Sequence, residues 1–342
     1  ELAKSDYRLM INGLVDTPLV FTMQDLMRFP RENRVYFLEC AANSGMEWRG
    51  SQLNGCQFTH GMVHCVAYTG VPLKYLLEEA GVKTNGKWVL AEGADASAMT
   101  RSIPIEIPGI GGAIAKAFAG EGASVVCNDI NLETLNRTVS GIQGAGGHAV
   151  ALVADVALEQ TAIDAVALAK TKFSGLSVLV NNAIFDLALA PLTDIALDDW
   201  QRTMDVNLNS AFLMSKHAIP VMATGGGGSI IHIASQLARA AKHGRPWYVA
   251  AKGALISMAR AMAIDHADQN IRVNTLSPGP VETDRFVSNF DDRKAARSAN
   301  NTLMNRLGTP DEIAAGAVFM ASDEASFMTG ADLLIDGGYT AQ

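Results

Sequence analysis

The sequence has no cluster of Lys and Arg and no long run of uncharged apolar residues. Its 27 Lys and Arg are outnumbered by 35 Asp and Glu, which gives a net charge of −8. Nucleic-acid binding depends on clustered cations that neutralise phosphates, so we expect no nucleic-acid partner. A membrane-spanning helix needs about 18 to 20 consecutive apolar residues, so we expect no membrane partner either.

Closely spaced cysteine pairs are also missing. Cys40, Cys56, Cys65 and Cys127 form no C-x-x-C motif, and a chain of 342 residues can build a hydrophobic core without disulfides. We therefore expect free thiols and a cytoplasmic location. The sequence begins at Glu1 without a signal-like hydrophobic segment, which fits either a removed leader or a truncation.

From about Ile110 onward, apolar runs alternate with segments of helical period. This alternation predicts an α/β fold with a parallel sheet that is covered by helices on both faces. The runs are continuous Val, Ile and Leu, as expected of strands buried on both faces. The predicted strands are 124–127, 149–153, 177–180, 229–233, 272–275 and 333–335, and two predicted helices are 159–173 and 250–267.

The region before about Pro108 has a different, mostly β texture with frequent turns. One helix is predicted over residues 72–80, because Pro72 suits a first helical turn and Gly81 suits a helix end. The change of texture, in a chain of this length, predicts two domains, 1–107 and 108–342. The turn pairs are Asn12-Gly13, Asn54-Gly55 and Asn85-Gly86, and the strand-like runs are 34–38 and 87–91.

Residues 225–228 are four consecutive glycines. They lie between a predicted helix and a predicted strand. We interpret them as a helix end followed by a turn, rather than as a flexible linker between domains.

The segment "SIIHIASQLARAAKHGRPWYVAAK" places three reactive side chains near one another. Ser235 follows a buried strand, Tyr248 begins a helix, and Lys252 is four residues later on the same helical face. A cation beside a phenol favours the phenolate, which makes a tyrosine a usable proton donor and acceptor near neutral pH. A serine hydroxyl can hold a carbonyl or alcohol oxygen. The trio suits hydride transfer between an alcohol and a nicotinamide.

With these residues, the chain from about 109 to 342 resembles the short-chain dehydrogenase/reductase family. The resemblance implies a Rossmann-like doubly wound parallel sheet and a catalytic site of Ser235, Tyr248, Lys252 and Asn207. It implies that Tyr248 is the acid and base, that Lys252 also binds the nicotinamide ribose, that Ser235 orients the substrate, and that Asn207, within "DVNLNSAF", supports a proton-relay water.

The same resemblance implies a set of cofactor-binding positions. "LVNNA" matches a family motif except that Ile184 replaces a glycine, and "ADV", "SPGPVET" and "TGADLLIDGGY" match three others. The implied positions beyond Tyr248 and Lys252 are Gly109, Ile110, Gly111, Asp129, Asp155, Val156, Asn181, Ala183, Pro278, Gly279, Val281 and Thr283.

Asp129 lies at the end of the second predicted strand, twenty residues after Gly109. A carboxylate at this place can accept hydrogen bonds from both adenosine ribose hydroxyls, and it repels a 2′-phosphate. No arginine is adjacent in sequence. We therefore expect NAD to be the cofactor rather than NADP.

The start of the cofactor loop departs from the family. The family's threonine and first glycine correspond to Pro104 and Ile105, and the first strand would be residues 98–103, which a proline ends. A proline removes a hydrogen-bond donor from a central strand, and the missing glycine removes a close approach to pyrophosphate. The helix start at Gly111 and Gly112 is kept. Alternatively, residues 87–94 with Gly93 replace the strand and turn, and 95–108 form an insertion.

Residues from about 7 to 107 resemble the molybdopterin domain of sulfite oxidase and sulfite dehydrogenase. "VYFLECAANSGMEWRG" and "FTHGMVHCVAYTGVPLKYLLEEAGV" carry this resemblance, which implies that Cys40 is the molybdenum ligand. Only a fragment of that family's protein is present, so we expect no stable molybdopterin centre. We interpret His60, His64 and Cys65 as structural residues rather than as metal ligands.

The chain is thus predicted to be a fusion whose function is NAD(H)-dependent interconversion of a secondary alcohol and a ketone. The family implies a homo-oligomer, either a tetramer or a dimer, and a small-molecule substrate. Residues 282–302, which cap the substrate pocket in the family, are polar and identify no single compound. Two alternatives remain, a molybdenum-dependent sulfite dehydrogenase and a catalytically impaired remnant.

Overall fold

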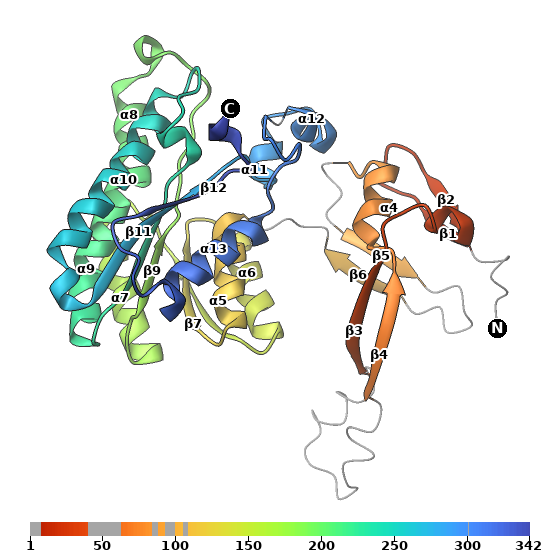
Figure 1. The fold of residues 1–342 in the computed structure, drawn as a ribbon, viewed down its shortest axis with the longest axis horizontal. Coiled ribbons are helices and arrows are strands. Elements are labelled where there is room, and N and C mark those ends of the chain that lie inside the picture. Colours follow the sequence, from red (N-terminus) through yellow and green to blue (C-terminus); the bar gives the residue numbers. More distant parts are fainter. Residues whose placement is uncertain (1–7, 40–62, 84–87, 93–99, 105–108, 300) are drawn as a thin grey trace, which may run out of the picture. The chain divides into compact units, whose positions relative to one another are not determined.

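A computed structural model describes residues 8–39, 63–83, 88–92, 100–104, 109–299 and 301–342. The chain divides into two compact units, Glu1–Glu106 and Ile107–Gln342. Each unit has its own secondary structure (Figure 1).

The first unit is built from short antiparallel pairs. β1 pairs with β2, β3 with β4, and β5 with β6. The mostly β character predicted for this region is confirmed. Its elements are β1 (Arg8–Ile11), β2 (Leu19–Thr22), α1 (Met23–Leu26), β3 (Glu32–Glu39), β4 (Val63–Gly70), α4 (Leu73–Ala80), β5 (Trp88–Glu92) and β6 (Thr100–Pro104).

Helix α4 begins and ends close to the predicted residues. Pro72 is the N-cap rather than the first helical residue, and Gly81 ends the helix with a φ of +68°. A left-handed residue at this position suits glycine, because it has no Cβ to clash with the backbone. Leu76 and Ala80 are buried on the inner face of the helix.

The second unit alternates strands and helices, as predicted. Its strands are β7 (Ser124–Asp129), β8 (His148–Val153), β9 (Val178–Asn181), β10 (Gly228–Ile233), β11 (Ile271–Pro278) and β12 (Asp332–Ile335). Its helices are α5 (Ile110–Gly120), α6 (Leu132–Gly144), α7 (Glu159–Phe173), α8 (Leu197–Met204), the π-helical turn Asp205–Asn209, α9 (Ser210–Thr224), α10 (Pro246–Asp265), α11 (Asp284–Val287), α12 (Arg293–Ser298) and α13 (Pro310–Ala321).

The strands of the second unit pair in parallel. The larger sheet has the order β12-β11-β10-β9, and β7 pairs with β8 in a second sheet. Each predicted strand overlaps its observed counterpart to within about three residues, which is ordinary for strand ends. Gly225 caps α9, and Gly226 and Gly227 have positive φ, so the glycine run is a helix end and turn, as predicted.

The prediction that residues 98–103 form the first strand of the dehydrogenase sheet is wrong. Residues Thr100–Pro104 do form a strand, but it pairs antiparallel with β5 in the first unit. The alternative that 87–94 fills this place is contradicted by the same pairing, and Gly93 lies outside the described residues. A central strand uses backbone N–H donors along both of its edges, and proline has none. Pro104 instead ends β6, which pairs along one edge with β5. Among the described strands, none pairs with the second edge of β7 or β9.

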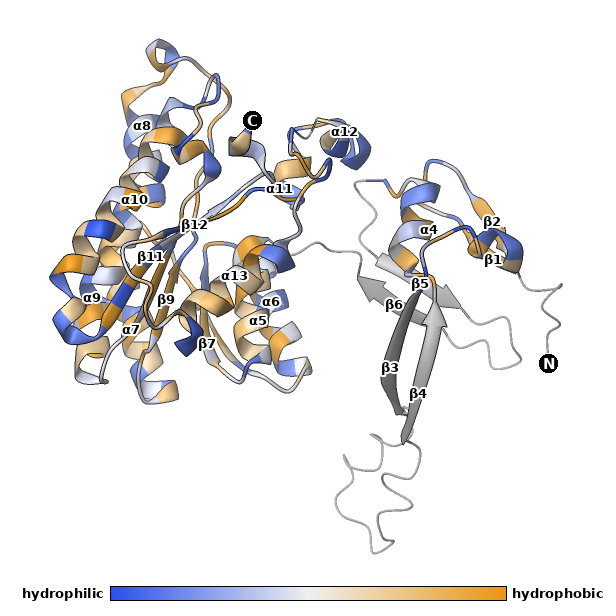
Figure 2. Ribbon diagram, viewed as in Figure 1, coloured by the Kyte–Doolittle hydropathy of each residue, from blue (hydrophilic) through white to orange (hydrophobic). Residues whose placement is uncertain are grey.

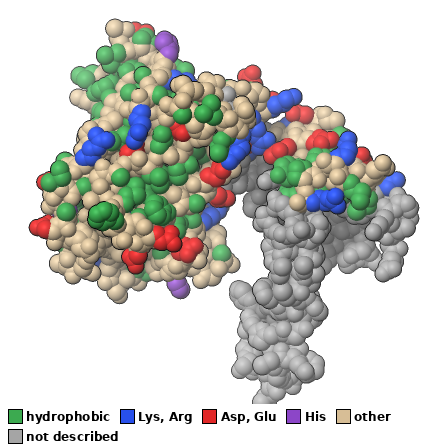
Figure 3. Space-filling view, viewed as in Figure 1, with side chains coloured by type: hydrophobic (Ala, Val, Ile, Leu, Met, Phe, Trp, Pro, Cys, Tyr) green, Lys and Arg blue, Asp and Glu red, His purple; other side chains and the backbone are tan. Residues whose placement is uncertain are grey.

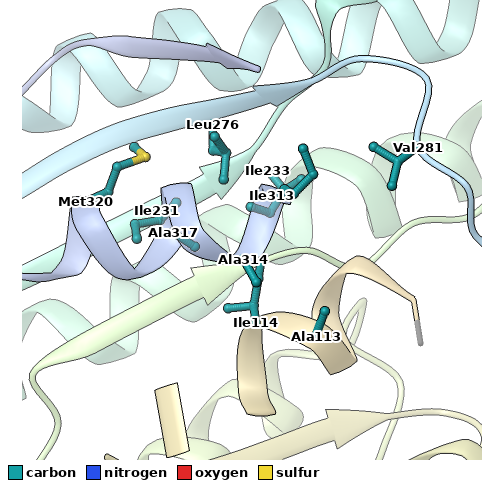
Figure 4. Close-up of a cluster of buried hydrophobic side chains, with 10 residues drawn as sticks. All are labelled: Ala113, Ile114, Ile231, Ile233, Leu276, Val281, Ile313, Ala314, Ala317 and Met320. Carbon is teal, nitrogen blue, oxygen red and sulfur yellow. The ribbon is translucent and has the colours of Figure 1, made fainter. Parts of the chain in front are cut away.

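Helix α5 joins the cores of the two sheets. Its Ala113 and Ile114 are buried in one cluster with Ile231 of β10 and with residues of β11 and α13 (Figure 4). Its Ala115 and Ala119 pack against a separate cluster on β7, β8 and α6. The helix therefore bridges the two sheets at the place where the described residues supply no shared strand.

The strands of the second unit carry mostly hydrophobic residues (Figure 2). On the face shown in Figure 3, basic side chains are scattered among acidic and hydrophobic ones. None of the helices in the described part of the chain combines the length and apolar character needed to cross a membrane.

Candidate active site

Two of the predicted catalytic side chains lie at the carboxyl end of β10. Lys252 lies in α10 and is buried, and its Nζ donates a hydrogen bond of 2.6 Å to the carbonyl oxygen of Ile233. Ser235 lies two residues after Ile233 and is also buried. Its Oγ accepts a hydrogen bond from the backbone N–H of Leu237 at 3.1 Å. The strand end therefore positions both side chains.

Tyr248 lies one helical turn before Lys252 on α10. The Lys252 Nζ is 5.9 Å from the centre of the Tyr248 ring, and the guanidinium carbon of Arg245 is also 5.9 Å from it. The ring packs edge-on against the buried Trp247 at 5.6 Å. The phenol is thus held between two cations and an aromatic side chain.

Burial and, after it, the positive charge of Arg285 together lower the pKa of Lys252 to about 7. An ammonium group loses its hydration when it is buried, so its neutral form is favoured. A group with such a pKa changes its charge near neutral pH, which is typical of active sites.

Asn207 lies in the π-helical turn Asp205–Asn209, a type of irregularity that often marks functional sites. Its side chain is buried and makes two hydrogen bonds to one residue. Oδ1 accepts from the N–H of Phe185 at 2.7 Å, and Nδ2 donates to the carbonyl oxygen of Phe185 at 2.9 Å. Asn207 therefore fixes the loop that follows β9.

Sequence reasoning missed His232, which lies on β10 directly before Ile233. Its ring is fully buried, Nδ1 is 3.0 Å from Asn181 Nδ2, and Nε2 has no hydrogen-bond partner. Burial, followed by the charge of Lys252, lowers the pKa of His232 to about 4. A histidine in an apolar strand gives no sequence signal, because its surroundings come from α10 and β9.

Sequence reasoning also missed an ionic group beside Tyr248. Asp186 is paired with Arg245 at 3.6 Å and with Arg285 at 3.7 Å. Arg245 could have been noticed, since it lies three residues before Tyr248. Asp186 and Arg285 come from distant segments and gave no signal.

The predicted diphosphate-binding residues form the start of α5. Gly109 is the N-cap, and an added Cβ on it meets no atom within 4 Å. The first N–H groups of a helix lack partners within the helix and attract anions. A Cβ on Gly111 would lie 2.6 Å from Nδ2 of Asn182, so this glycine allows a close approach between α5 and the end of β9.

The predicted adenosine residues end the smaller sheet. Asp129 is the last residue of β7, and its Oδ1 accepts from the N–H of Asn131 at 2.9 Å, which leaves Oδ2 for a ribose. Asp155 follows β8 and accepts from Arg202 at 2.7 Å. Burial raises the pKa of Asp155, but the backbone N–H of Ala157 and then Arg202 bring it below its ordinary value. Its neighbour Val156 lies in the same turn.

The residues expected at the nicotinamide lie mostly in the segment after β11. Pro278 ends the strand, and Gly279 donates to the carbonyl oxygen of Ile335 at 2.8 Å. Val281 is buried, and the Oγ1 of Thr283 caps α11 by accepting from the N–H of Phe286. Asn181 ends β9, and Ala183 follows it. These positions, with Gly109 and Asp129, suit the diphosphate, ribose and nicotinamide parts of a dinucleotide.

The metal-binding residues considered from the sequence are not placed. Cys40, Cys56 and His60 lie outside the described residues, and for His64 and Cys65 only the backbone, in β4, is described. Cys127 is a free thiol, and burial raises its pKa to about 11. Within the described ranges, no group of three or more His, Cys, Asp or Glu could hold a metal ion.

Two family models match this chain. The model described as enoyl-(acyl carrier protein) reductase matches residues 106–340, and the one described as an oxidoreductase molybdopterin-binding domain matches residues 1–109. The resemblance stated for each part of the sequence is confirmed by these matches.

Individual relatives agree with the first match. D-threitol dehydrogenase of Mycolicibacterium smegmatis is 39% identical over 68% of this chain and 89% of its own length. Cyclohexanol dehydrogenase of an Acinetobacter species is 34% identical over 68% of this chain and 92% of its own length. The structure of a 7α-hydroxysteroid dehydrogenase with NADH and 7-oxo glycochenodeoxycholic acid has a TM-score of 0.64 at 36% identity, covering 67% of this chain and 89% of that one. Fold, site geometry and relatives together show that this chain is an oxidoreductase of the short-chain dehydrogenase/reductase family, preceded by a region similar to molybdopterin-binding domains.

Proposed function

We propose that the second unit interconverts a secondary alcohol and a ketone with NAD(H) as the hydride carrier. When bound, the nicotinamide accepts or supplies the hydride. In this proposal Tyr248 transfers the hydroxyl proton as acid and base, and Ser235 holds the substrate oxygen. Lys252 tunes Tyr248 and binds the ribose, while Asn207 fixes the loop after β9 and supports the relay.

The observation that carries the proposal is the burial of Lys252 beside the ring of Tyr248. A lysine is rarely buried unless a specific partner holds it. Here the hydrogen bond to Ile233 fixes Nζ at the strand end that also presents Ser235. The contacts of Lys252 with the Tyr248 ring and with the end of the strand that precedes Ser235 support the use of these three side chains in carbonyl reduction.

NAD is proposed over NADP because of Asp129. Its carboxylate lies at the carboxyl end of β7, where it can accept from both ribose hydroxyls and repel a 2′-phosphate. Asp155 and Val156 complete this side of the site. Gly109, Ile110 and Gly111 supply N–H groups to the diphosphate.

The proposed activity depends on a sheet that the described residues leave divided between β7 and β9. Helix α5 bridges the two parts, so the helix start that would bind the diphosphate stays attached to both cores. If this bridge is insufficient, the protein is the catalytically impaired remnant that the sequence also allows.

Substitution of the proposed acid and base tests the mechanism. Removal of a general acid and base costs about 100- to 10,000-fold in rate, so Tyr248→Phe should lower kcat by at least about 100-fold in the oxidation of a secondary alcohol with NAD. The binding of NADH should persist in this variant. A variant that keeps full turnover would show that Tyr248 is not the proton-transferring group.

The match of residues 1–109 supports a second candidate function, sulfite oxidation at a molybdenum held by the thiolate of Cys40. Elemental analysis of the purified protein tests it. Molybdenum in an equimolar amount would support this function, and its absence after expression with molybdate would leave the dehydrogenase as the activity of the chain. The proposed homo-oligomer is tested separately by light scattering.

A further inference from the structure

Two arginines converge on one aspartate next to the proposed catalytic tyrosine. Arg245 Nη1 is 3.6 Å from Asp186 Oδ1, and Arg285 Nη1 is 3.7 Å from Asp186 Oδ2. The guanidinium of Arg245 also lies 5.9 Å from the centre of the Tyr248 ring. Arg285 is close enough to Lys252 for its charge to contribute to that lysine's lowered pKa. The group therefore borders the place where the substrate oxygen would react.

This ionic group is incompletely bonded. Both distances are longer than an ordinary hydrogen bond between nitrogen and oxygen. Asp186 Oδ1 and Arg245 Nε are buried and have no hydrogen-bond partner. Buried polar atoms are usually paired, because an unpaired one loses its hydration without compensation. The unpaired Nε–H of Arg245 can therefore donate to an acceptor on a ligand, whereas the unpaired Oδ1 of Asp186 can only accept.

The local charge balance indicates the sign of that ligand. Asp186 is one carboxylate facing two guanidinium groups. The two acids next to Arg285 along the chain are already engaged. Glu282 bonds Arg297 through two hydrogen bonds of 2.9 Å, and Asp284 bonds Arg293 at 3.0 Å. An excess of positive charge remains beside Tyr248, and it favours an anion.

The side chains of Arg245, Asp186 and Arg285 differ in how far they are exposed to solvent. The side chain of Arg245 is 15% exposed and that of Asp186 is 24% exposed, whereas that of Arg285 is 45% exposed. Asp186 is further fixed by its neighbour Phe185, whose backbone is bonded twice to Asn207. Arg285 can therefore move toward a ligand while Arg245 and Asp186 keep their places.

We propose that Arg285 and Arg245 bind a carboxylate of the substrate, so that the substrate is a secondary alcohol or ketone that carries a carboxylate group. This inference rests on the proposed function. A planar carboxylate suits the two donors that a guanidinium presents side by side. Asp186 holds the two arginines in place without bonding them tightly, and the substrate carboxylate completes their hydrogen bonds at a fixed distance from Tyr248.

The test compares two alcohols that differ only in the charged group, cyclohexanol and 4-hydroxycyclohexanecarboxylate, each oxidised with NAD. The wild-type protein should prefer the acid in kcat/KM. Arg285→Gln should lower kcat/KM for the acid by about 10- to 100-fold, the usual effect of losing a hydrogen bond to a charged group. The ratio of kcat/KM for the acid to that for cyclohexanol should fall by at least about 10-fold, because a change in the pKa of Lys252 affects both alcohols alike whereas the lost carboxylate contact affects only the acid. Arg260→Gln, which replaces an exposed arginine on α10 outside the ionic group and outside residues 282–302, should change neither value.

Two results would overturn the assignment. Equal losses for both alcohols in Arg285→Gln would show that the arginine does not recognise the carboxylate. A weaker affinity for NADH in Arg285→Gln, with the preference between the alcohols unchanged, would assign Arg285 to the phosphates of the cofactor instead.

Binding of a non-reactive acid separates this inference from the proposed function. Calorimetry with cyclohexanecarboxylate and with its amide, each in the presence of NADH, needs no turnover. Binding of the acid alone, lost in Arg285→Gln, supports the carboxylate site even if neither alcohol is oxidised, in which case only the proposed reaction fails. Equal binding of acid and amide, or binding of neither, overturns the site.

Discussion

Lys252 and Ile233 are joined by a hydrogen bond of 2.6 Å between a buried ammonium nitrogen and the last carbonyl oxygen of β10. The bond ties the middle of α10 to the strand that ends two residues before Ser235. It explains how a single helix and a single strand can hold the proposed catalytic side chains at one place. The proposals below depend on this junction and on the cofactor site next to it.

Gly109→Val should abolish the binding of NADH without lowering the stability of the fold. The φ of Gly109 is −61°, and an added Cβ meets no atom within 4 Å, so the fold should tolerate valine. The same space is where a diphosphate would approach the start of α5. We expect the melting temperature without ligand to change by less than about 2 °C, and the stabilisation by NADH to disappear. A variant that binds NADH like the wild type would remove Gly109 from the cofactor site.

Asp129→Ser should reverse the preference between the two dinucleotides. The carboxylate at the end of β7 is proposed to bond the ribose hydroxyls and to repel a 2′-phosphate. We expect the affinity for NADH to fall about 10-fold, and that for NADPH to rise. Fluorescence titration with both dinucleotides measures the two effects. Unchanged affinities in this variant would mean that the adenosine ribose lies elsewhere.

The free energy of unfolding should depend on pH through His232. Its folded pKa of about 4 is below the unfolded value of 6.5, so the unfolded chain takes up a proton first as the pH falls. The contribution of His232 to the free energy of unfolding is therefore fully present above about pH 6.5, and it is lost as the pH falls from about 6.5 to about 4. The change that His232→Asn makes in the free energy of unfolding should be more favourable by about 2 kcal/mol at about pH 5 than at about pH 7.5, because the variant has no histidine to protonate at this position.

Urea unfolding at the two pH values measures this difference. His148→Asn is the matched control, because His148 is exposed at the start of β8 and should leave the pH dependence unchanged. If His232→Asn and the wild type lose stability in parallel as the pH falls, other groups cause the loss.

Asn207 should act on stability and on the substrate loop together. Asn207→Ala removes both hydrogen bonds to Phe185 and leaves the N–H and the carbonyl of this partly buried residue without those partners, at a cost of about 1 to 3 kcal/mol. Because Phe185 precedes Asp186, KM should rise as well. Asn209→Ala is the control, since Asn209 is exposed and bonds only Asp205 within the same turn. Thermal unfolding and steady-state kinetics of the two variants check the prediction. An effect of Asn207→Ala as small as that of the control would contradict it.

Local patterns were sufficient to predict most of the second unit. Helix α7 begins at Glu159 and ends at Phe173, as predicted, because an apolar stripe and polar flanks define it without reference to other elements. The strands were found because continuous apolar runs bounded by turns are typical of parallel sheets. Of the three residues in the predicted catalytic motif, Ser235 and Lys252 lie at the carboxyl end of β10, and Lys252 also contacts the ring of Tyr248.

The errors arose where distant segments decide the outcome. Residues 98–103 have strand propensity, but propensity does not specify a partner, and the strand pairs with β5 instead of entering the dehydrogenase sheet. His232 and Asp186 gain their properties from side chains on other elements. Such contacts depend on tertiary structure and leave no local pattern.

Dinucleotide binding is the central claim, and a thermal-shift titration of the purified chain with NADH and, separately, NADPH tests it most directly. A ligand that binds only the folded state stabilises it by RT ln(1 + [L]/Kd), so the melting temperature keeps rising with the logarithm of the ligand concentration above Kd. We predict a rise of about 5 °C or more at an NADH concentration about 100-fold above Kd, and a smaller one with NADPH at the same concentration. No shift with either dinucleotide would contradict the account and would mean that the divided sheet no longer holds the cofactor.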